Sequence, residues 1–550
     1  MRMETKKYSI LAIIPARGNS KGIPRKNIRL MNGKPLIYYV INNAKQCPYI
    51  TDIVVSTDDE EIASIAGLYD TKTVKREKHL ADDTTPLDPV IFDAVTKIEQ
   101  ENQKKYDIIV TLQATSPTLK ATTLTQAIES FINNDFDTLI SAVNIPHLAW
   151  TKDDKDCFLP LYTKRLNRQQ LPPYYLETGA FLITSRESVT IDNRIGKNVS
   201  MHEITEEEAI DIDTKYDWIV CEQILAKKRI VFRVDGNKII GMGHIYHCLT
   251  LAYNLIGHEF IFVTRDDCKE GLIKLHNCNM PILTIKDDDD FFTFLHKNKY
   301  DIVINDCLDT TVEYTKKLKS LVERVISIED MGKGIKYADV VINALYECKI
   351  KQDNLFSGEN YVCLRDEFMY STPKPFQESV KKIIVTFGGT DPLNMTKKVY
   401  SILPNIHKKY PQIQFHIVTG IGYDYSKNNI VTITDSNITV FNDCKFVSKI
   451  MREADLAIAS QGRTMYELAS LGIPSILMAQ NEREVLHHFG QMRNGFFSLG
   501  EGDHVSPETL ENTIEWLIDT PKIREEMHSN MLKHDLKKGI QRELDLILGY

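Results

Sequence analysis

The sequence predicts an α/β protein built from parallel, doubly wound sheets that are divided among several domains. Apolar runs of strand length alternate along the chain with segments whose apolar residues recur at helical spacing. Several of these runs end in loops rich in glycine, and the loops at strand ends are where a parallel sheet binds its ligands. The chain has 550 residues, which is enough for about two to four domains of ordinary size.

The composition is that of a globular protein, with 43% hydrophobic and 26% charged residues. A formal net charge of −8 argues against a general nucleic-acid binder. No apolar run reaches the roughly 18 residues of a membrane span, and the first run lacks the cleavage site of a signal peptide. We therefore expect a cytoplasmic protein without a membrane partner. The ten cysteines include no C-x-x-C pair, which argues against a disulfide framework and a zinc site.

A basic loop with two glycines follows the first predicted strand. Gly18 and Gly22 allow backbone N–H groups to approach a phosphate chain closely. Arg17, Lys21 and Lys26 supply positive charge that suits phosphoryl chemistry. The loop lacks the Walker pattern of a P-loop, so on spacing alone a solvated basic turn is an equal alternative.

Strands and helices continue to alternate through the first half. The pattern predicts helices over residues 35–47, 86–100 and 121–133 and strands over 52–57, 107–112 and 138–143. The acids at 58–61 begin a further helix, where a favourable charge at the helix N-terminus explains them better than catalysis. Ligands of a parallel sheet bind at the carboxyl ends of its strands, so we expect the chemistry in the loops that follow them.

Two later loops carry polar side chains at such positions. Gln113 and Ser116 could read a base or a sugar, although Thr-Ser-Pro is also a good helix-entry turn. Asp211 and Asp213 alternate with apolar neighbours, so a strand would present both carboxylates on one face. Two close carboxylates require a cation, and Mg²⁺ takes such oxygens together with phosphate. The alternative is that Asp213 only caps the helix that follows.

The ordered motifs of residues 8–228 resemble the cytidylyltransferases that activate sialic acid and related nonulosonic acids. They are IPARGNSKGIP at 14–24 with Lys26-Asn27, STDD at 56–59, LADDT at 80–84, QATSP at 113–117, RQQLP at 168–172, TGAF at 178–181 and DID at 211–213. The resemblance implies a Rossmann-like nucleotidyltransferase sheet. It also implies transfer of CMP from CTP to the anomeric hydroxyl of a nine-carbon 2-keto acid, with release of pyrophosphate.

The resemblance assigns roles to particular residues. It implies that CTP is bound by Arg17, Gly18, Asn19, Ser20, Lys21 and Lys26, and that Lys26, Asp211 and Asp213 are catalytic, with both aspartates holding Mg²⁺. The sugar acid would be faced by Gln113, Ser116, Arg168 and Gln169. Members of this family often dimerise, so a homodimer through this domain is implied. Thr178 stands where sialic-acid enzymes carry asparagine, which leaves the sugar open.

A new strand and loop begin near residue 229 without a flexible Pro/Gly/Ser linker. We place the domains at 1–228, 229–375 and 376–550. Further strands are predicted over 259–264, 281–285, 301–305, 324–327 and 340–343, and then over 382–387, 414–418, 456–459 and 474–478. The acids at 287–290 are interpreted as a solvated helix entrance.

Glycine-bearing loops recur in the second half. The G-x-G at 241–243 is a weak dinucleotide signal because a third glycine is missing. His244 follows at a helix entrance, where the positive helix end favours the neutral imidazole that a general base needs, and packing against the turn is the equal alternative. The loops at 388–392 and 460–464 would aim N–H groups at a pyrophosphate, and Glu467 could bind ribose hydroxyls. A second nucleotide site is therefore predicted.

Residues 229–500 resemble the UDP-sugar hydrolases of pseudaminic acid biosynthesis and their spore-coat polysaccharide relatives. The motifs are FRVD at 232–235, GMGH at 241–244, L-x-LA at 249–252, GENY at 358–361 with LR-x-EF at 364–368, FGGTDP at 387–392 and ELA-x-LG at 467–472. The resemblance implies a glycosyltransferase-B-like pair of Rossmann-like lobes with the active site between them. It implies metal-free hydrolysis of a UDP-linked diacetamido-trideoxyhexose to free sugar and UDP, with His244 as the catalytic residue that activates water. The UDP-sugar would contact Asp235, Gly243, Gly388, Gly389, Ser460, Gly462, Thr464, Glu467 and Asn481.

Two positions depart from that second pattern. The family usually has Gly-His-x-x-Arg, whereas His247 takes the place of the arginine here, and Glu482 follows Asn481 where glutamine is common. The sequence therefore predicts a bifunctional enzyme of nonulosonic acid biosynthesis whose partners are CTP, a nonulosonic acid and a UDP-sugar. For the second half, a glycosyltransferase with the same lobes and a catalytically silent nucleotide-sugar-binding regulator are the alternatives.

Overall fold

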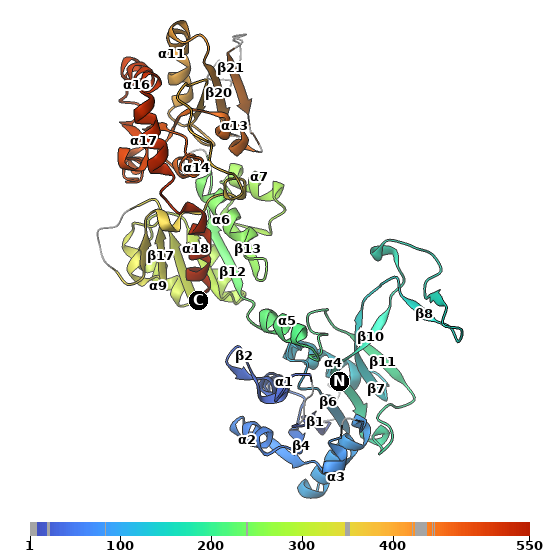
Figure 1. Cartoon of the computed structure of the whole chain (residues 1–550). Coiled ribbons are helices and arrows are strands. Elements are labelled where there is room, and N and C mark those ends of the chain that lie inside the picture. Colours follow the sequence, from blue (N-terminus) through green and yellow to red (C-terminus); the bar gives the residue numbers. More distant parts are fainter. Residues whose placement is uncertain are drawn as a thin grey trace. The chain divides into compact units, whose positions relative to one another are not determined.

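The computed structural model describes residues 8–18, 22–82, 84–237, 240–346, 352–420, 422–423, 437–442, 444 and 446–549. The chain divides into two compact units, Met1–Lys227 and Lys228–Tyr550. In Figure 1 the first unit runs from blue to green and the second from green to red. Both units are α/β, and the parallel-sheet, Rossmann-like fold class that the sequence predicts is confirmed.

The first unit is built on a seven-stranded sheet in the order β11-β7-β10-β6-β1-β4-β5. The strands are β1 (Ile10–Pro15), β4 (Asp52–Thr57), β5 (Lys72–Lys75), β6 (Ile108–Leu112), β7 (Thr138–Asn144), β10 (Tyr175–Ser185) and β11 (Val199–Glu203). Neighbouring strands are parallel except that β10 runs antiparallel to β6 and β7. The central strands β1 and β6 are apolar except for Thr111, and all their residues except Pro15 are buried, as a sheet covered on both faces requires.

Helices cover both faces of this sheet. They are α1 (Leu36–Gln46), α2 (Glu60–Leu68), α3 (Leu87–Asn102) and α4 (Ala121–Asn133). A further helix, α5 (Lys215–Leu225), packs in a separate cluster with Met31 and Leu36. Alternate residues of β1 point to opposite faces, so Ala12 and Ile14 pack with α1, α2 and α4, whereas Leu11 and Ile13 pack with α3. A short hairpin of β2 (Leu30–Met31) and β3 (Lys34–Pro35) precedes α1.

An arm that the sequence did not predict projects from the sheet between β7 and β10 (Figure 1). It contains the antiparallel pair β8 (Trp150–Lys152) and β9 (Phe158–Pro160). Several large apolar side chains of this arm are exposed, among them Trp150, Phe158 and Leu161.

The segment that carries Asp211 and Asp213 is not a strand, so this prediction is wrong. The N–H of Ile212 between them donates to the carbonyl of Thr115 at 2.9 Å, and this bond ties the segment to the loop after β6 without a ladder. Helix α5 begins at Lys215, and Thr214 is its N-cap in a capping box with Asp217. The alternative role of Asp213 as the helix cap is therefore also wrong.

The second unit contains two lobes, each built on a parallel sheet. The first sheet has the order β14-β13-β12-β15-β16-β17-β18 and the second, within the described residues, the order β21-β20-β19-β22-β23-β24. The strands of the first are β12 (Arg229–Val234), β13 (Glu259–Arg265), β14 (Ile282–Ile285), β15 (Ile302–Asp306), β16 (Arg324–Ile328), β17 (Val340–Asn343) and β18 (Leu355–Ser357). Those of the second are β19 (Lys382–Thr386), β20 (Gln414–Thr419), β21 (Ile438–Asn442), β22 (Leu456–Ser460), β23 (Ser475–Ala479) and β24 (Phe496–Glu501).

The first lobe carries helices α6 (Gly243–Tyr253), α7 (Lys269–Asn277), α8 (Asp288–Lys297) and α9 (Val312–Lys319). The short helix α10 (Asp366–Met369) follows, and its Phe368 packs in the core of the second lobe. The second carries α11 (Met395–Lys409), α13 (Val447–Glu453), α14 (Thr464–Leu471), α15 (Glu482–Val485), α16 (Pro507–Asp519) and α17 (Pro521–Met531). The last helix, α18 (Gly539–Leu548), lies in the range 376–550 that the sequence assigns to the second lobe. It nevertheless lies beside the first lobe (Figure 1), and its Ile540, Leu544 and Ile547 pack in the core of that lobe with Phe232. None of the described helices is long and apolar enough to cross a membrane.

Candidate functional site

In the first unit, the opening loop reaches the segment 211–213 beside the carboxyl ends of the adjacent strands β1 and β6. The Nζ of Lys26 donates to the carbonyl of Ile212 and lies 3.4 Å from Asp213 Oδ1. A Cβ on Gly22 would lie 2.5 Å from the carbonyl oxygen of Asp213, so glycine is required where the loop passes this segment. The structure thus brings together residues that lie almost 190 positions apart in the chain.

The loop after β6 contacts the same segment. Its Thr115 accepts the N–H of Ile212. Gln113 lies against Gly179, where a Cβ would lie 2.9 Å from the amide nitrogen of Gln113. Ser116 is only 1% exposed, which argues against its predicted contact with the sugar acid.

Asp211 has the electrostatics of a cation ligand. Its carboxyl group is partly buried, and its Oδ1 has no hydrogen-bond partner among the described residues. Burial raises the pKa of Asp211, the charge of Asp213 raises it further, and Thr115 and Lys26 oppose the shift. A bound divalent cation would relieve the cost of ionising a carboxyl group in this position. The two carboxylates offer hard oxygen ligands and therefore fit Mg²⁺.

Two acidic residues of the loop after β4 contact the opening loop near Gly18. The N–H of Gly18 donates to Asp58 Oδ1 at 3.0 Å, and a Cβ on Gly18 would lie 2.4 Å from Asp59 Oδ2. Asp59 also caps α2, as the helix-entrance interpretation predicts. The carbonyl of Arg17 accepts a hydrogen bond from Asn27 at 3.0 Å. Asn19, Ser20 and Lys21 lie outside the described residues.

The remaining predicted residues of the first unit lie in a short turn, Arg168–Gln170, that follows the β8–β9 pair. Arg168 Nη2 donates to Glu206 at 2.8 Å, and Gln169 is exposed. Within the described part of the chain, neither side chain bonds to Gln113 or Asp211. Their predicted contact with the sugar acid stays a prediction.

The second unit contains a cavity of about 790 Å³. Its wall includes every residue that the sequence assigns to the UDP-sugar site except Asp235, namely Gly243, His244, Gly388, Gly389, Ser460, Gly462, Thr464, Glu467 and Asn481. These residues come from the start of α6 in the first lobe and from α14 and the loops after β19, β22 and β23 in the second. The structure therefore brings two separate glycine-bearing loops and the helix entrance around one cavity, whose volume lies in the usual range for ligand pockets.

Asp235 does not belong to this wall, so its predicted contact with the UDP-sugar is not supported. Both of its carboxylate oxygens accept hydrogen bonds from Arg233, at 2.7 and 2.8 Å. Thr264 and the backbone N–H of Arg265 donate to the same carboxylate. Asp235 therefore links the ends of β12 and β13. Glu467 is also partly engaged, because its Oε1 accepts a hydrogen bond from Arg365 at 2.7 Å.

His244 is paired with a buried carboxylate. Its Nδ1 lies 2.6 Å from Oδ1 of Asp306, the last residue of β15. Burial alone would raise the pKa of Asp306, but His244 and His247 outweigh it and hold this pKa well below its usual value. An ionised carboxylate can only accept hydrogen bonds. The neutral His244 ring therefore carries its proton on Nδ1 and keeps Nε2 as a proton acceptor.

Sequence reasoning missed the charged groups around this pair. Glu329 lines the cavity, and burial is the main reason that its pKa is raised to about 7. Arg463 Nη2 lies 3.3 Å from Glu329 Oε1, and this ion pair joins the two lobes. A signal for Arg463 was available, because it lies in the glycine-bearing loop at 460–464 that the sequence predicts to bind a ligand. Asp306 gave no such signal, because acidic residues are common at the ends of strands.

Comparison with known proteins separates the two halves of the chain. Residues 11–202 match the family model described as cytidylyltransferase, and residues 383–542 match that of the glycosyltransferase family 28 C-terminal domain. The structure of MurG from Acinetobacter baumannii is similar over 59% of this chain and 100% of its own, at 17% identity and a TM-score of 0.44.

The relatives by sequence each cover between 38% and 52% of this chain. The pseudaminic acid cytidylyltransferase of Campylobacter jejuni is 36% identical over 216 residues, covering 38% of this chain and 92% of that enzyme. The CMP-N,N'-diacetyllegionaminic acid synthase of the same species is 31% identical over 227 residues, covering 40% of this chain and 97% of the synthase. An uncharacterised protein of Methanocaldococcus jannaschii is 30% identical over 276 residues, and this chain covers 46% of its own length and only 56% of that protein. Through residues 11–202, this chain belongs to the cytidylyltransferase family.

Proposed function

We propose that the chain is a bifunctional enzyme of nonulosonic acid biosynthesis. The first unit transfers CMP from CTP to a nonulosonic acid, and the second hydrolyses a UDP-linked diacetamido-trideoxyhexose. The observation that supports the first activity is the position of Lys26 beside the segment 211–213, at the carboxyl ends of β1 and β6. Lys26 contacts Ile212 and Asp213, and its charge acts on Asp211. It is supported by relatives whose names specify CMP transfer to pseudaminic and legionaminic acids.

The first reaction requires charge neutralisation more than covalent chemistry from the protein. The anomeric hydroxyl oxygen of the acid attacks the α-phosphorus, the bond to the bridging oxygen breaks, and pyrophosphate leaves while the hydroxyl proton passes to solvent. Arg17 and Lys26 hold phosphate oxygens in this proposal, and Asp211 and Asp213 hold Mg²⁺. When bound, Mg²⁺ neutralises charge on the phosphates. The Oδ1 of Asp211, which is buried and has no hydrogen-bond partner among the described residues, supports this assignment.

The first activity is tested with CTP, Mg²⁺ and a panel of pseudaminic, legionaminic and N-acetylneuraminic acids. We expect at least one acid to give pyrophosphate and the matching CMP-linked product in equal amounts. CTP without an acid is the control. Failure of every acid in the panel would contradict the proposed substrate class.

The observation that carries the second activity is the pairing of His244 with Asp306 at a cavity that the glycine-bearing loops also line. A water molecule at His244 Nε2 gives up its proton there as its oxygen bonds to the anomeric carbon of the sugar. The bond from that carbon to the β-phosphate oxygen breaks, and UDP leaves. Backbone N–H groups near Gly388 and Gly462 suit the pyrophosphate, and the second oxygen of Glu467 suits a ribose hydroxyl. No metal is required in this step.

The match of residues 383–542 to a glycosyltransferase family favours a second candidate function, transfer of the sugar to an acceptor. The two reactions use the same lobes and nucleotide loops. Incubation of the chain with the UDP-sugar alone separates them. We expect UDP and free sugar in equal amounts without an acceptor, and an absolute need for an acceptor would show that the second unit is a transferase.

We also propose that the first unit forms a homodimer through the arm that carries β8 and β9. Trp150, Phe158 and Leu161 are 51%, 67% and 58% exposed on this arm, and such apolar groups are stabilised by a protein partner. A second copy is the occupant because an arm can pair with its own equivalent about a twofold axis. Light scattering should give the mass of two chains for the wild type and the mass of one chain for Phe158→Asp. A monomeric wild type would contradict the proposal.

A further inference from the structure

A chain of polar contacts leads from the C-terminal helix α18 to His244. Glu543 Oε2 lies 3.0 Å from His247 Nε2, and His247 Nδ1 lies 3.3 Å from Asp306 Oδ2. The other oxygen of the same carboxylate, Oδ1, lies 2.6 Å from His244 Nδ1. The two histidines stand three residues apart on α6, and this spacing places both on one face of the helix. One carboxylate therefore bridges both rings.

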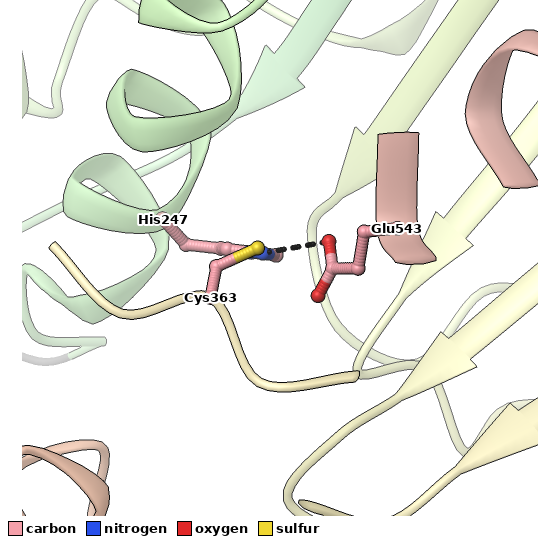
Figure 2. Close-up of side chains that lie close together, drawn as sticks. All are labelled: His247, Cys363 and Glu543. Atoms are coloured by element: carbon pink, nitrogen blue, oxygen red, sulfur yellow. Dashed lines mark hydrogen bonds and ion pairs between the residues drawn. The ribbon is translucent and has the colours of Figure 1, made fainter. Parts of the chain in front are cut away.

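The part of this chain behind His244 is sealed from solvent. The side chains of His247, Asp306 and Glu543 are at most 1% exposed, whereas that of His244 is 15% exposed. Both histidines belong to the cavity wall. Figure 2 shows His247 on α6 facing Glu543 on α18, with Cys363 beside them. Polar groups buried this deeply are costly unless they are paired, so these contacts restrict how each group can turn.

The groups around His247 favour its protonated form. These are the carboxylates of Asp306, Glu543 and Glu329 and the thiol of Cys363, whereas the guanidinium of Arg463 opposes them. Burial and the Arg463 charge lower the pKa of His247, but Glu543 and Asp306 outweigh both, and the pKa lies well above its usual value. His247 therefore holds the position of a buried cation between two anions.

We propose that His247 and Glu543 are positioning residues that act through Asp306 to hold the His244 imidazole with its Nε2 toward the cavity. The proposal rests on the proposed role of His244 as the base in hydrolysis. It gives a function to α18, which packs in the core of the first lobe and brings Glu543 to the centre of the unit. Without His247, Asp306 Oδ2 loses the ring contact and keeps the weaker one from Cys248 Sγ, at 3.6 Å, so the carboxylate is held less firmly. Glu543 then loses its buried partner.

The test compares steady-state UDP release by full-length His247→Gln, His247→Arg and Glu543→Gln. We expect His247→Gln to lower kcat by about 10-fold or more while KM for the UDP-sugar changes little. His247→Arg should recover most of the activity because it restores the cation, and its activity should fall less at alkaline pH, where a histidine loses its proton and an arginine does not. Glu543→Gln should give an intermediate loss. His416→Gln, a buried histidine on β20 outside the cavity wall, and Asp545→Asn on α18 are matched controls that keep wild-type kinetics.

A second measurement separates this proposal from the proposed hydrolysis. The ring ¹⁵N signals of His244, identified with a His244→Gln variant, report its tautomer whether or not the chain hydrolyses UDP-sugars. We expect these signals to shift in His247→Gln and not in His416→Gln. Unchanged signals together with a wild-type kcat in His247→Gln would overturn the proposal. So would one tightly bound zinc ion per chain that is lost in His247→Gln, because His247, Cys363 and Glu543 offer ligand atoms within 4.8 Å of one another and would then be metal ligands.

Discussion

Replacing Asp211 with asparagine is expected to lower CTP-dependent pyrophosphate release by about 100-fold or more. The substitution keeps the shape of the side chain but removes the charge that we assign to Mg²⁺, while Lys26 and Asp213 stay in place. The loss should appear in kcat at saturating CTP and Mg²⁺. Asp154→Asn, an exposed acid on the arm, is the control and should keep full activity. Wild-type activity of Asp211→Asn would contradict the metal assignment.

The same substitution should not destabilise the metal-free protein. Burial raises the pKa of Asp211 in the folded state, so the folded protein binds this proton more tightly than the unfolded chain. The stability that this proton provides is present below the unfolded pKa of about 3.9 and is lost as pH rises through the raised folded value. At neutral pH the ionised group therefore costs stability, and asparagine avoids that cost. In EDTA, we expect the thermal midpoint of Asp211→Asn to match or exceed that of the wild type, and added Mg²⁺ should raise only the midpoint of the wild type.

Replacing His244 with alanine is expected to lower UDP release from the UDP-sugar by about 100-fold to 10,000-fold, the usual contribution of a general base. The reason is that Nε2 of His244, the ring atom that Asp306 leaves as a proton acceptor, is lost from the cavity. KM should change less than kcat, because the glycine-bearing loops and Glu467 remain. His416→Gln serves as the control for loss of a buried histidine.

This experiment also tests the regulatory alternative for the second unit. If the second unit only binds a nucleotide-sugar and regulates the first, UDP release should be absent or the same in His244→Ala and the wild type. Binding of the UDP-sugar, measured by calorimetry, should then be retained in both proteins. Under our account, binding is retained in His244→Ala but turnover is lost.

The fold and the location of both candidate sites could be predicted where a short stretch of sequence, such as an apolar run or a glycine-bearing loop, is enough to indicate its own structure. The apolar run of β1 is buried in the sheet, and the glycines at 388–389 and 462 line the cavity as the sequence predicts. The predicted strand at 211–213 failed because alternation of apolar and acidic residues also suits an extended segment with only Ile212 buried. The resemblance to the hydrolases implies a ligand contact for Asp235, but Arg233 and Thr264 hold its carboxylate.

The charged network of the second unit could not be predicted for a similar reason. His247 and Glu543 are 296 residues apart, and no periodicity in either helix shows that α18 packs on the first lobe. Asp306 lies at the end of an ordinary apolar strand, and its role depends on which helix faces it. Pairing of buried charges is a property of the assembled lobes, so it becomes visible only in three dimensions.

The most direct test of the account is one assay of both products on the same preparations. The wild type, Asp211→Asn and His244→Ala are each given CTP, Mg²⁺, a nonulosonic acid that the wild type accepts and the UDP-sugar, and pyrophosphate and UDP are quantified together. We predict that Asp211→Asn loses pyrophosphate release and keeps UDP release, whereas His244→Ala shows the reverse. Loss of both products in either variant, or of neither, would contradict two separate activities in this chain.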